Sequence, residues 1–201
     1  AIPESSGFWD LHIGNPGLAA MIPVQKQPEP DDFDLKVRQK GRKWLADNGL
    51  TNHGPVPKGT RLEPYWRECL TQMYESYQRI CAYSCMFIPP VTGALSIDHL
   101  VPKSQAIEHA YEWSNYRLVC SKMNSRKHVF ADVLDPFDIS DGTFRLELFS
   151  GRIYPNPELL GPEFKAATDT IHRLGLVDAD LRAWRIECLD YLREGEISLV
   201  H

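Results

Sequence analysis

The spacing of apolar residues changes near Cys81. Before this position, apolar side chains recur at three- and four-residue intervals, which predicts a helix with one buried face. After it, short apolar runs are bounded by prolines, glycines and polar residues, which predicts strands over 86–88, 95–97 and 116–119. A polar helix over about 121–130 follows, and the whole order predicts an α+β unit. The helical stripe consists of Leu62, Trp66, Cys69, Leu70, Met73, Tyr77 and Ile80.

The N-terminal part contains an arm followed by helices. Residues 1–30 hold five prolines and three glycines, which predicts an extended arm without helix or strand. Met21 is a candidate start of translation, so residues 1–20 are either native or an upstream or artificial extension. Residues 31–90 are expected to be mainly helical, beginning with an amphipathic helix that ends at Gly49.

The C-terminal part is expected to support a core formed by residues 91–130. Residues 131–201 contain a hairpin signal at Ser150-Gly151, between two apolar runs. Two further helices are expected over 162–174 and 178–193, packing on the core. The predicted architecture is therefore a small α+β core with flanking N-terminal and C-terminal helices and an additional β-hairpin.

Composition excludes several classes of protein. A chain of 201 residues with 43% hydrophobic and 24% charged residues is expected to be globular, not disordered or membrane-embedded. No apolar run approaches the roughly 20 residues that cross a bilayer, and no signal-peptide pattern opens the sequence. We therefore expect a cytoplasmic location without a membrane partner. Five cysteines, an odd number, favour reduced thiols over a disulfide framework.

The charge distribution permits a local nucleic-acid site. The net charge of −5 argues against a protein that coats nucleic acid with its whole surface. Between residues 91 and 130, however, five Lys or Arg residues stand against three Asp or Glu residues. This segment is therefore basic within an acidic chain.

The same segment contains residue types suited to phosphodiester hydrolysis. Asp98 offers a carboxylate oxygen and Asn124 an amide oxygen, a ligand pair that suits Mg²⁺, with Mn²⁺ or another divalent ion as alternatives. His99 is expected on the opposite face of its strand, where its neutral imidazole could take a proton from the attacking water. Asn115 is expected to orient His99 through the intervening loop. An Asp-His pair alone is a weak signal, and the strand, loop, strand and helix order strengthens it.

The predicted helix at 121–130 adds basic residues and a second histidine. Lys127 and His128 follow Asn124 by three and four residues and are expected to share its helix face. Lys127 is predicted to contact phosphate, with a solvated surface lysine as the alternative. His128 is predicted to be a further metal ligand, with a packing role as the alternative. The residues predicted to contact nucleic acid are Lys103, Lys122, Arg126 and Lys127.

These residues resemble the HNH, or ββα-metal, endonucleases. The resemblance lies in the runs Ser96-Ile-Asp-His-Leu-Val-Pro-Lys-Ser104, Trp113-Ser-Asn-Tyr-Arg-Leu-Val-Cys120 and Ser121-Lys-Met-Asn-Ser-Arg-Lys127. In that family the Asp-His pair supplies a metal ligand and the general base, the middle Asn orients, and the last His or Asn binds metal. The resemblance thus implies these roles for Asp98, His99, Asn115 and Asn124.

A finer resemblance concerns the bacterial anti-phage nucleases. The segments 21–30, 150–155 and 167–176 resemble standalone HNH proteins of Septu and retron-associated defence systems. This resemblance implies a partner ATPase or defence-complex subunit that restrains or directs the nuclease. It also implies attack on DNA, with RNA as an alternative substrate.

One departure from the family concerns structural zinc. Many HNH proteins frame the motif with two Cys-x-x-Cys pairs. Cys81 and Cys120 are in register, but Ser84 and Met123 stand at the other two positions, and Cys85 lies one position late. A three-thiolate site is the alternative, whereas a packed, metal-free substitute is expected, so structural Zn²⁺ is not predicted.

We therefore predict a metal-dependent endonuclease that cleaves DNA with low intrinsic sequence specificity. No dedicated recognition helix is evident in the sequence, which is the basis for the expected low specificity. The alternatives are an RNA-cleaving enzyme with the same chemistry and a noncatalytic binding subunit with the same fold. A purely structural α+β domain without nuclease or binding function is a third alternative.

Overall fold

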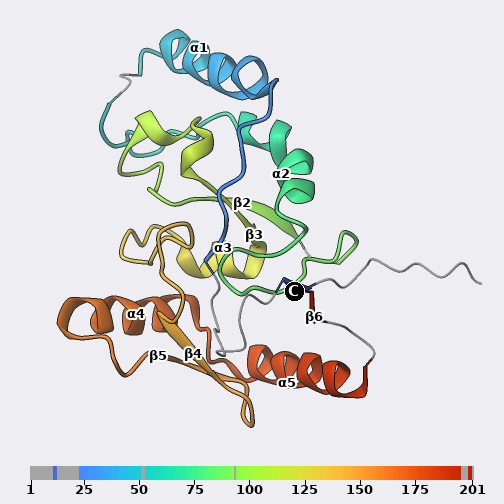
Figure 1. The fold of residues 1–201 in the computed structure, drawn as a ribbon. Coiled ribbons are helices and arrows are strands. Elements are labelled where there is room, and N and C mark those ends of the chain that lie inside the picture. The colour runs from blue at the N-terminus through green and yellow to red at the C-terminus, as the bar shows by residue number, and fades with distance from the viewer. Residues whose placement is uncertain (1–10, 13–22, 51–52, 93, 196–198, 201) are drawn as a thin grey trace, which may run out of the picture. The chain divides into compact units, whose positions relative to one another are not determined.

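The computed structural model describes residues 11–12, 23–50, 53–92, 94–195 and 199–200 (Figure 1). Chain contacts divide the protein into two compact units. One unit comprises residues 21–139, and the other comprises residues 140–201 with residues 1–20. Among the described residues, no helix is both long and apolar enough to cross a membrane.

The centre of the 21–139 unit is a ββα arrangement. Strand β2 (Leu95–His99) pairs with β3 (Tyr116–Cys120) in antiparallel register, with Asp98 opposite Arg117 and His99 opposite Tyr116. Helix α3 (Ser121–Lys127) begins directly after β3 and packs against both strands (Figure 1). The expected α+β class is therefore confirmed.

The helical region before this core is more broken than the sequence predicted. A π-helical turn (Asp34–Arg38) leads into α1 (Gln39–Asp47), and a 3-10 turn (Tyr65–Cys69) leads into α2 (Leu70–Ser76). The helix does not continue to Ile80, because Gln78 and Arg79 adopt positive φ angles of 52° and 65°.

The strand predicted over 86–88 does not form. Phe87 makes only an isolated antiparallel bridge with Ile80, so the segment around it is a turn that closes on the end of α2. Ile88 of this run is buried, so the apolar pattern here indicates burial and not a strand.

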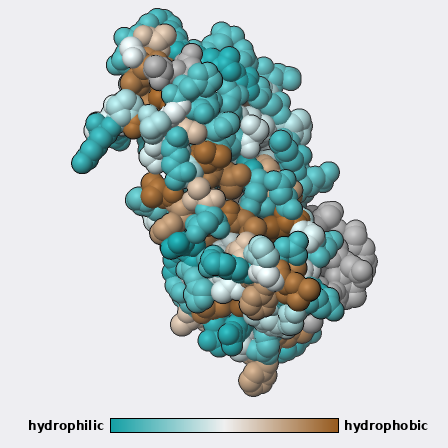
Figure 2. All heavy atoms as spheres, turned by 90° about the vertical axis from the view of Figure 1, so that its left-hand side faces the viewer, coloured by the Kyte–Doolittle hydropathy of each residue, from teal (hydrophilic) through white to brown (hydrophobic). Residues whose placement is uncertain are grey.

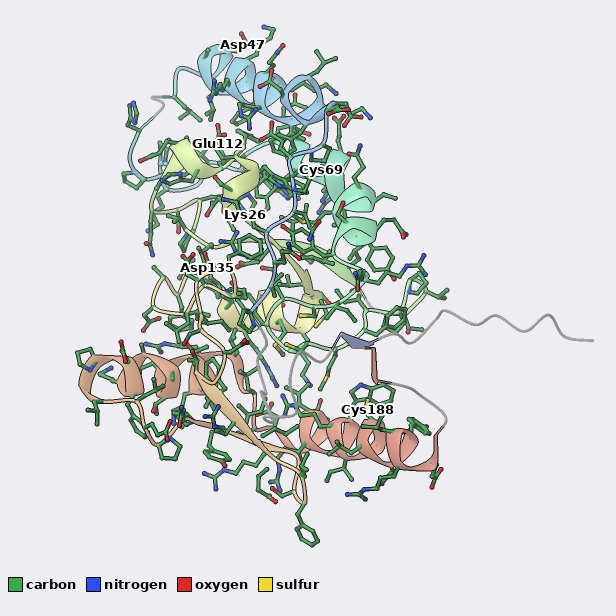
Figure 3. All side chains as sticks on the ribbon, in the orientation of Figure 1. Lys26, Asp47, Cys69, Glu112, Asp135 and Cys188 are labelled. Atoms are coloured by element: carbon green, nitrogen blue, oxygen red, sulfur yellow. The ribbon has the colours of Figure 1, made fainter. Side chains whose placement is uncertain are left out.

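Aromatic side chains hold the first unit together. Phe33 makes edge-to-face contacts with Trp113 and Tyr116, with ring centroids 5.6 and 5.8 Å apart. Arg38 and Arg42 both bind Glu112, which lies in the connection between β2 and β3 (Figure 3). The surface around α1 is mostly hydrophilic on the face shown in Figure 2.

The second unit contains the predicted hairpin and helices. Strands β4 (Phe144–Glu147) and β5 (Arg152–Pro155) are antiparallel, and helices α4 (Gly161–Leu174) and α5 (Ala179–Glu194) follow. Gly175 ends α4 with φ 57°, a left-handed conformation that glycine adopts without steric cost.

The N-terminal arm differs in part from the expectation. Residues 23–30 form neither helix nor strand. However, strand β1 (Leu11–His12) pairs in parallel with β6 (Leu199–Val200). Most of the remaining arm, including the candidate start at Met21, lies outside the described residues.

Candidate active site

Asp98 lies on the face of β2 that α3 covers. Asp98 is 2% exposed, and the Tyr83 hydroxyl donates to Asp98 Oδ2 at 2.7 Å. Lys127 Nζ lies 3.4 Å from the same oxygen. Burial raises the pKa of Asp98, while the positive charge of Lys127 opposes that rise.

His99, the last residue of β2, points to the other face of the strand and is also buried. His99 Nε2 is 2.9 Å from the carbonyl oxygen of Ala110, which can only accept, so Nε2 bears the proton. In the neutral ring, Nδ1 therefore holds the lone pair. Burial lowers the pKa of His99 well below its usual value, and the nearby Lys103 cation lowers it further. The imidazole is thus neutral at pH 7.

Lys103 lies directly at this nitrogen. Its ammonium is 3.2 Å from His99 Nδ1 and 4.5 Å from the centroid of the Trp66 ring. Trp66 also meets the imidazole edge to face, with ring centroids 4.9 Å apart. Burial lowers the pKa of Lys103, whereas Asp98 raises it, so the lysine interacts with Asp98 as well as with His99.

Asn115 fixes the connection between the two strands. Its amide nitrogen donates to the carbonyl oxygens of Val101 and His109, both at 3.0 Å. Its amide oxygen accepts from the Val101 N–H at 2.8 Å. These bonds hold the loop that presents the Ala110 carbonyl to His99, an arrangement suited to the positioning role predicted for Asn115.

Asn124 faces the same side of β2 as Asp98. Its amide nitrogen donates to Ser96 Oγ at 2.6 Å and to the Ile97 carbonyl oxygen at 3.3 Å. The carbonyl acceptor fixes the orientation of the amide, so Asn124 Oδ1 points away from these partners. The Asn124 side chain therefore lies on the face of β2 that bears Asp98.

The structure corrects the prediction for Lys127. The side chain is fully buried, and its ammonium donates to the carbonyl oxygens of His99 and Leu100 at 2.6 and 2.7 Å. Lys127 therefore fastens α3 to the end of β2 and offers no surface to a phosphate. The helical spacing placed it correctly beside Asn124, but that face points into the protein.

The remaining predicted residues lie along or after α3. His128 is exposed and adopts φ 46°, so the helix ends at Lys127 and does not continue to 130 as predicted. Within the described residues, no three His, Cys, Asp or Glu side chains form a group that could hold a metal, so Asp98, His99 and His128 do not form one. Lys122 is exposed and Arg126 half-buried, and their contact with nucleic acid stays a prediction.

Sequence reasoning missed three side chains of this site. Tyr83 binds Asp98, Trp66 packs on His99, and Ser96 binds Asn124. The two-residue period of a strand could have indicated Ser96, because it places Ser96 and Asp98 on one face. Trp66 belonged to the helical stripe assigned to core packing, and no sequence spacing links Tyr83 to Asp98.

The region that contains the site resembles a known protein family. Residues 80–130 match the family model described as HNH endonuclease. No curated protein matches the chain. The HNH match covers the ββα unit with Asp98, His99, Asn115 and Asn124, and it supports nuclease activity in general. HNH nucleases generally use divalent metal ions.

The residues present fit a divalent ion of the magnesium type. Mg²⁺ keeps several waters and needs only one or two protein oxygen ligands. The Asn124 amide oxygen and the Asp98 carboxylate can supply two, although Tyr83 and Lys127 engage Asp98 Oδ2. Four-ligand zinc at the former Cys-x-x-Cys positions does not fit, because Met123 is fully buried and Ser84 supplies no thiolate.

Proposed function

We propose that this chain is a metal-dependent HNH endonuclease that hydrolyses phosphodiester bonds of DNA with low intrinsic sequence specificity. The observation that carries the proposal is the 2.9 Å contact between His99 Nε2 and the Ala110 carbonyl oxygen. The Nε2–H of His99 is bound to Ala110, so Nδ1 of a neutral imidazole is the proton acceptor. The match of residues 80–130 to HNH endonucleases supports the same chemistry.

The proposed reaction begins with the substrate phosphate drawing Lys103 away from His99. The Lys103 ammonium covers Nδ1, and a phosphate is a stronger partner for that cation than a neutral ring nitrogen. His99 Nδ1 then accepts a proton from the attacking water, whose oxygen forms the new bond to phosphorus. The bond from phosphorus to the leaving 3′ oxygen breaks, and that oxygen takes up a proton from solvent. Asn115 acts through the loop by keeping the Ala110 carbonyl on Nε2.

Asp98 and Asn124 are the proposed holders of a divalent ion, Mg²⁺ or Mn²⁺. Such an ion supplies stabilisation of negative charge on the scissile phosphate and the leaving oxygen. Tyr83 orients the Asp98 carboxylate, and Ser96 orients the Asn124 amide. Lys122 and Arg126 are the proposed contacts to flanking phosphates, because both lie on α3 near these ligands.

The biological setting is proposed from the finer sequence resemblance alone. The segments 21–30, 150–155 and 167–176 support a role as the effector of an anti-phage defence system, of the Septu or retron-associated kind, in the bacterial cytoplasm. A partner ATPase or complex subunit would then control when the nuclease acts.

Plasmid cleavage by the purified chain tests the enzymatic proposal. The assay compares the wild type with His99→Ala and with His109→Ala, an exposed histidine on the same loop, in Mg²⁺, Mn²⁺ or EDTA. Metal-dependent cleavage is expected, with a loss of roughly 10²-fold or more for His99→Ala and no change for His109→Ala. Unfolding curves of all three proteins separate lost chemistry from lost structure.

Other outcomes assign the alternatives. Cleavage of a structured RNA without cleavage of plasmid would replace the DNA proposal by the RNA one. Unchanged cleavage by a folded His99→Ala variant would refute the assignment of the base. Binding of DNA without cleavage, in every metal and with the partner ATPase present, would indicate a noncatalytic subunit.

A further inference from the structure

Two cysteines meet where a turn packs on the end of β3. Cys81 lies in the turn 81–86, closed by hydrogen bonds from the Cys81 N–H to the Met86 carbonyl and from the Cys85 N–H to the Cys81 carbonyl, both 2.9 Å. The Ala82 N–H donates to the Leu118 carbonyl at 2.8 Å, which ties this turn to β3. Cys120 is the last residue of that strand.

The two sulfur atoms are in hydrogen-bond contact. The Cys81 thiol donates to the sulfur of Cys120, and the backbone N–H groups of Lys122 and Met123 donate to it as well. These donors stabilise a thiolate on Cys120 and lower its pKa to about 6. Burial raises the pKa of Cys81 well above its usual value, so the pair contains one thiolate and one thiol at pH 7.

Cys120, the residue with the lower pKa, is also the more solvent-accessible of the two. Cys81 is 1% exposed, whereas Cys120 is only half-buried. A small oxidant therefore reaches Cys120 first, and the neighbouring Cys81 is already in place to react with the product. A thiolate that is accessible and lies beside a second thiol is the arrangement typical of cysteines that oxidise reversibly.

We propose that Cys81 and Cys120 form a redox-active pair that a hydroperoxide converts into a disulfide. The Cys120 thiolate attacks one peroxide oxygen, the O–O bond breaks, and the leaving hydroxide takes up a proton to become water. Cys120 is then a sulfenic acid. The sulfur of Cys81 attacks it, loses its proton, forms the S–S bond and displaces the hydroxyl as a second water. The peroxide gains the two electrons that the two sulfurs lose.

Cys69 and Cys85 are the other two thiols of the 21–139 unit. Cys69 is buried, and its thiol donates to the Trp66 carbonyl at 3.1 Å. Cys85 is half-buried and does not belong to a metal-binding group with the pair, since no group of three His, Cys, Asp or Glu side chains occurs in the described residues. The proposed bond joins the turn 81–86 to the last residue of β3, directly before α3, the helix that bears Asn124. The proposal does not depend on the proposed nuclease activity.

Thiol mapping of the full-length wild type tests the proposal. The reduced protein is treated with hydrogen peroxide, free thiols are alkylated, and peptides are examined by mass spectrometry before and after reduction. The expected result is loss of alkylation at Cys81 and Cys120 in equal proportion, with a linked peptide lacking two hydrogens. Reduction should restore both alkylation sites. This measurement needs no variant, so it remains decisive even where a substitution prevents folding.

Variants then assign the order of the two steps. Cys120→Ser should leave Cys81 unoxidised, whereas Cys81→Ser should leave Cys120 as a sulfenic acid that dimedone traps. Cys85→Ser is the matched control and should form the Cys81–Cys120 bond at the wild-type rate. The proposal is overturned if both thiols stay alkylatable after peroxide, if Cys120 links to Cys85, or if both thiols are protected by stoichiometric zinc in the purified protein.

Discussion

Lys127 is a fully buried cation. Its ammonium is buried against the His99 and Leu100 carbonyls and beside Asp98. Lys127→Met keeps the apolar stem but leaves two carbonyl oxygens and a buried carboxylate without this cation. We expect the free energy of unfolding to fall by about 3 kcal/mol, measured by urea denaturation.

Lys122→Met on the same helix is the matched control for that substitution. Lys122 is exposed, so the change should alter the free energy of unfolding by less than about 0.5 kcal/mol. Equal stability losses for the two variants would show that the ammonium of Lys127 does not fasten α3 to β2.

Cys120 and Cys188 should differ in the pH dependence of alkylation. The pKa of Cys120 is lowered to about 6, whereas burial raises the pKa of Cys188. Because the thiolate is the reacting form, the iodoacetamide rate at Cys120 should be half-maximal near pH 6 and level above it. The rate at Cys188 should still be rising at pH 9. Rates measured by peptide mass spectrometry that rise in parallel would contradict the assigned thiolate.

Helix α1 depends on a glycine for its packing. A Cβ on Gly41 would lie 2.2 Å from Cγ of Tyr111, whose hydroxyl donates to the Glu63 carbonyl at 2.9 Å. Alanine improves helix propensity by about 1 kcal/mol, but the anchored ring must move to admit it. We expect Gly41→Ala to lower the free energy of unfolding by about 2 kcal/mol. The loss should vanish in a Tyr111→Ala background, and equal losses in both backgrounds would exclude the ring as the cause.

The elements of the core could be predicted because local pattern and tertiary packing agree there. Strands β2 and β3 lie within two residues of the predicted runs, and α3 starts at the predicted Ser121. The helix over 62–80 could not be predicted in detail, because the positive φ angles at Gln78 and Arg79 come from the turn that packs behind α2. Apolar spacing reports which side chains are buried but not where the backbone reverses.

The candidate site could be predicted as residue types but not as contacts. The order of Asp98, His99, Asn115 and Asn124 was sufficient to place them around one ββα unit. The burial of Lys127 could not be predicted, since helical spacing gives a shared face without showing whether that face meets solvent or β2. The hydrogen bond from Tyr83 to Asp98 could not be predicted for a similar reason, because the fold of the turn 81–86 brings these two residues together.

The whole molecule divides into two compact units, and the candidate site lies in the unit 21–139. The sequence predicts that the core ends at residue 130, and the compact unit that contains this core extends to Ile139. The segment 131–139 supplies Asp135, whose carboxylate receives two hydrogen bonds from the buried Arg117 guanidinium (Figure 3). The Phe137 ring lies 3.7 Å beneath that guanidinium.

Two fragments distinguish these boundaries. Residues 21–139 contain the aromatic core and both partners of the Arg117–Asp135 pair, so this fragment should unfold cooperatively in urea. Residues 21–130 lack Asp135 and Phe137, which contact the guanidinium of Arg117, a residue that is 2% exposed in the whole chain. The loss of these partners should cost about 3 kcal/mol or more. Circular dichroism at increasing urea measures both. Equal urea midpoints for the two fragments would place the boundary at residue 130, because Asp135 would then add no stability to the unit that contains β2, β3 and α3.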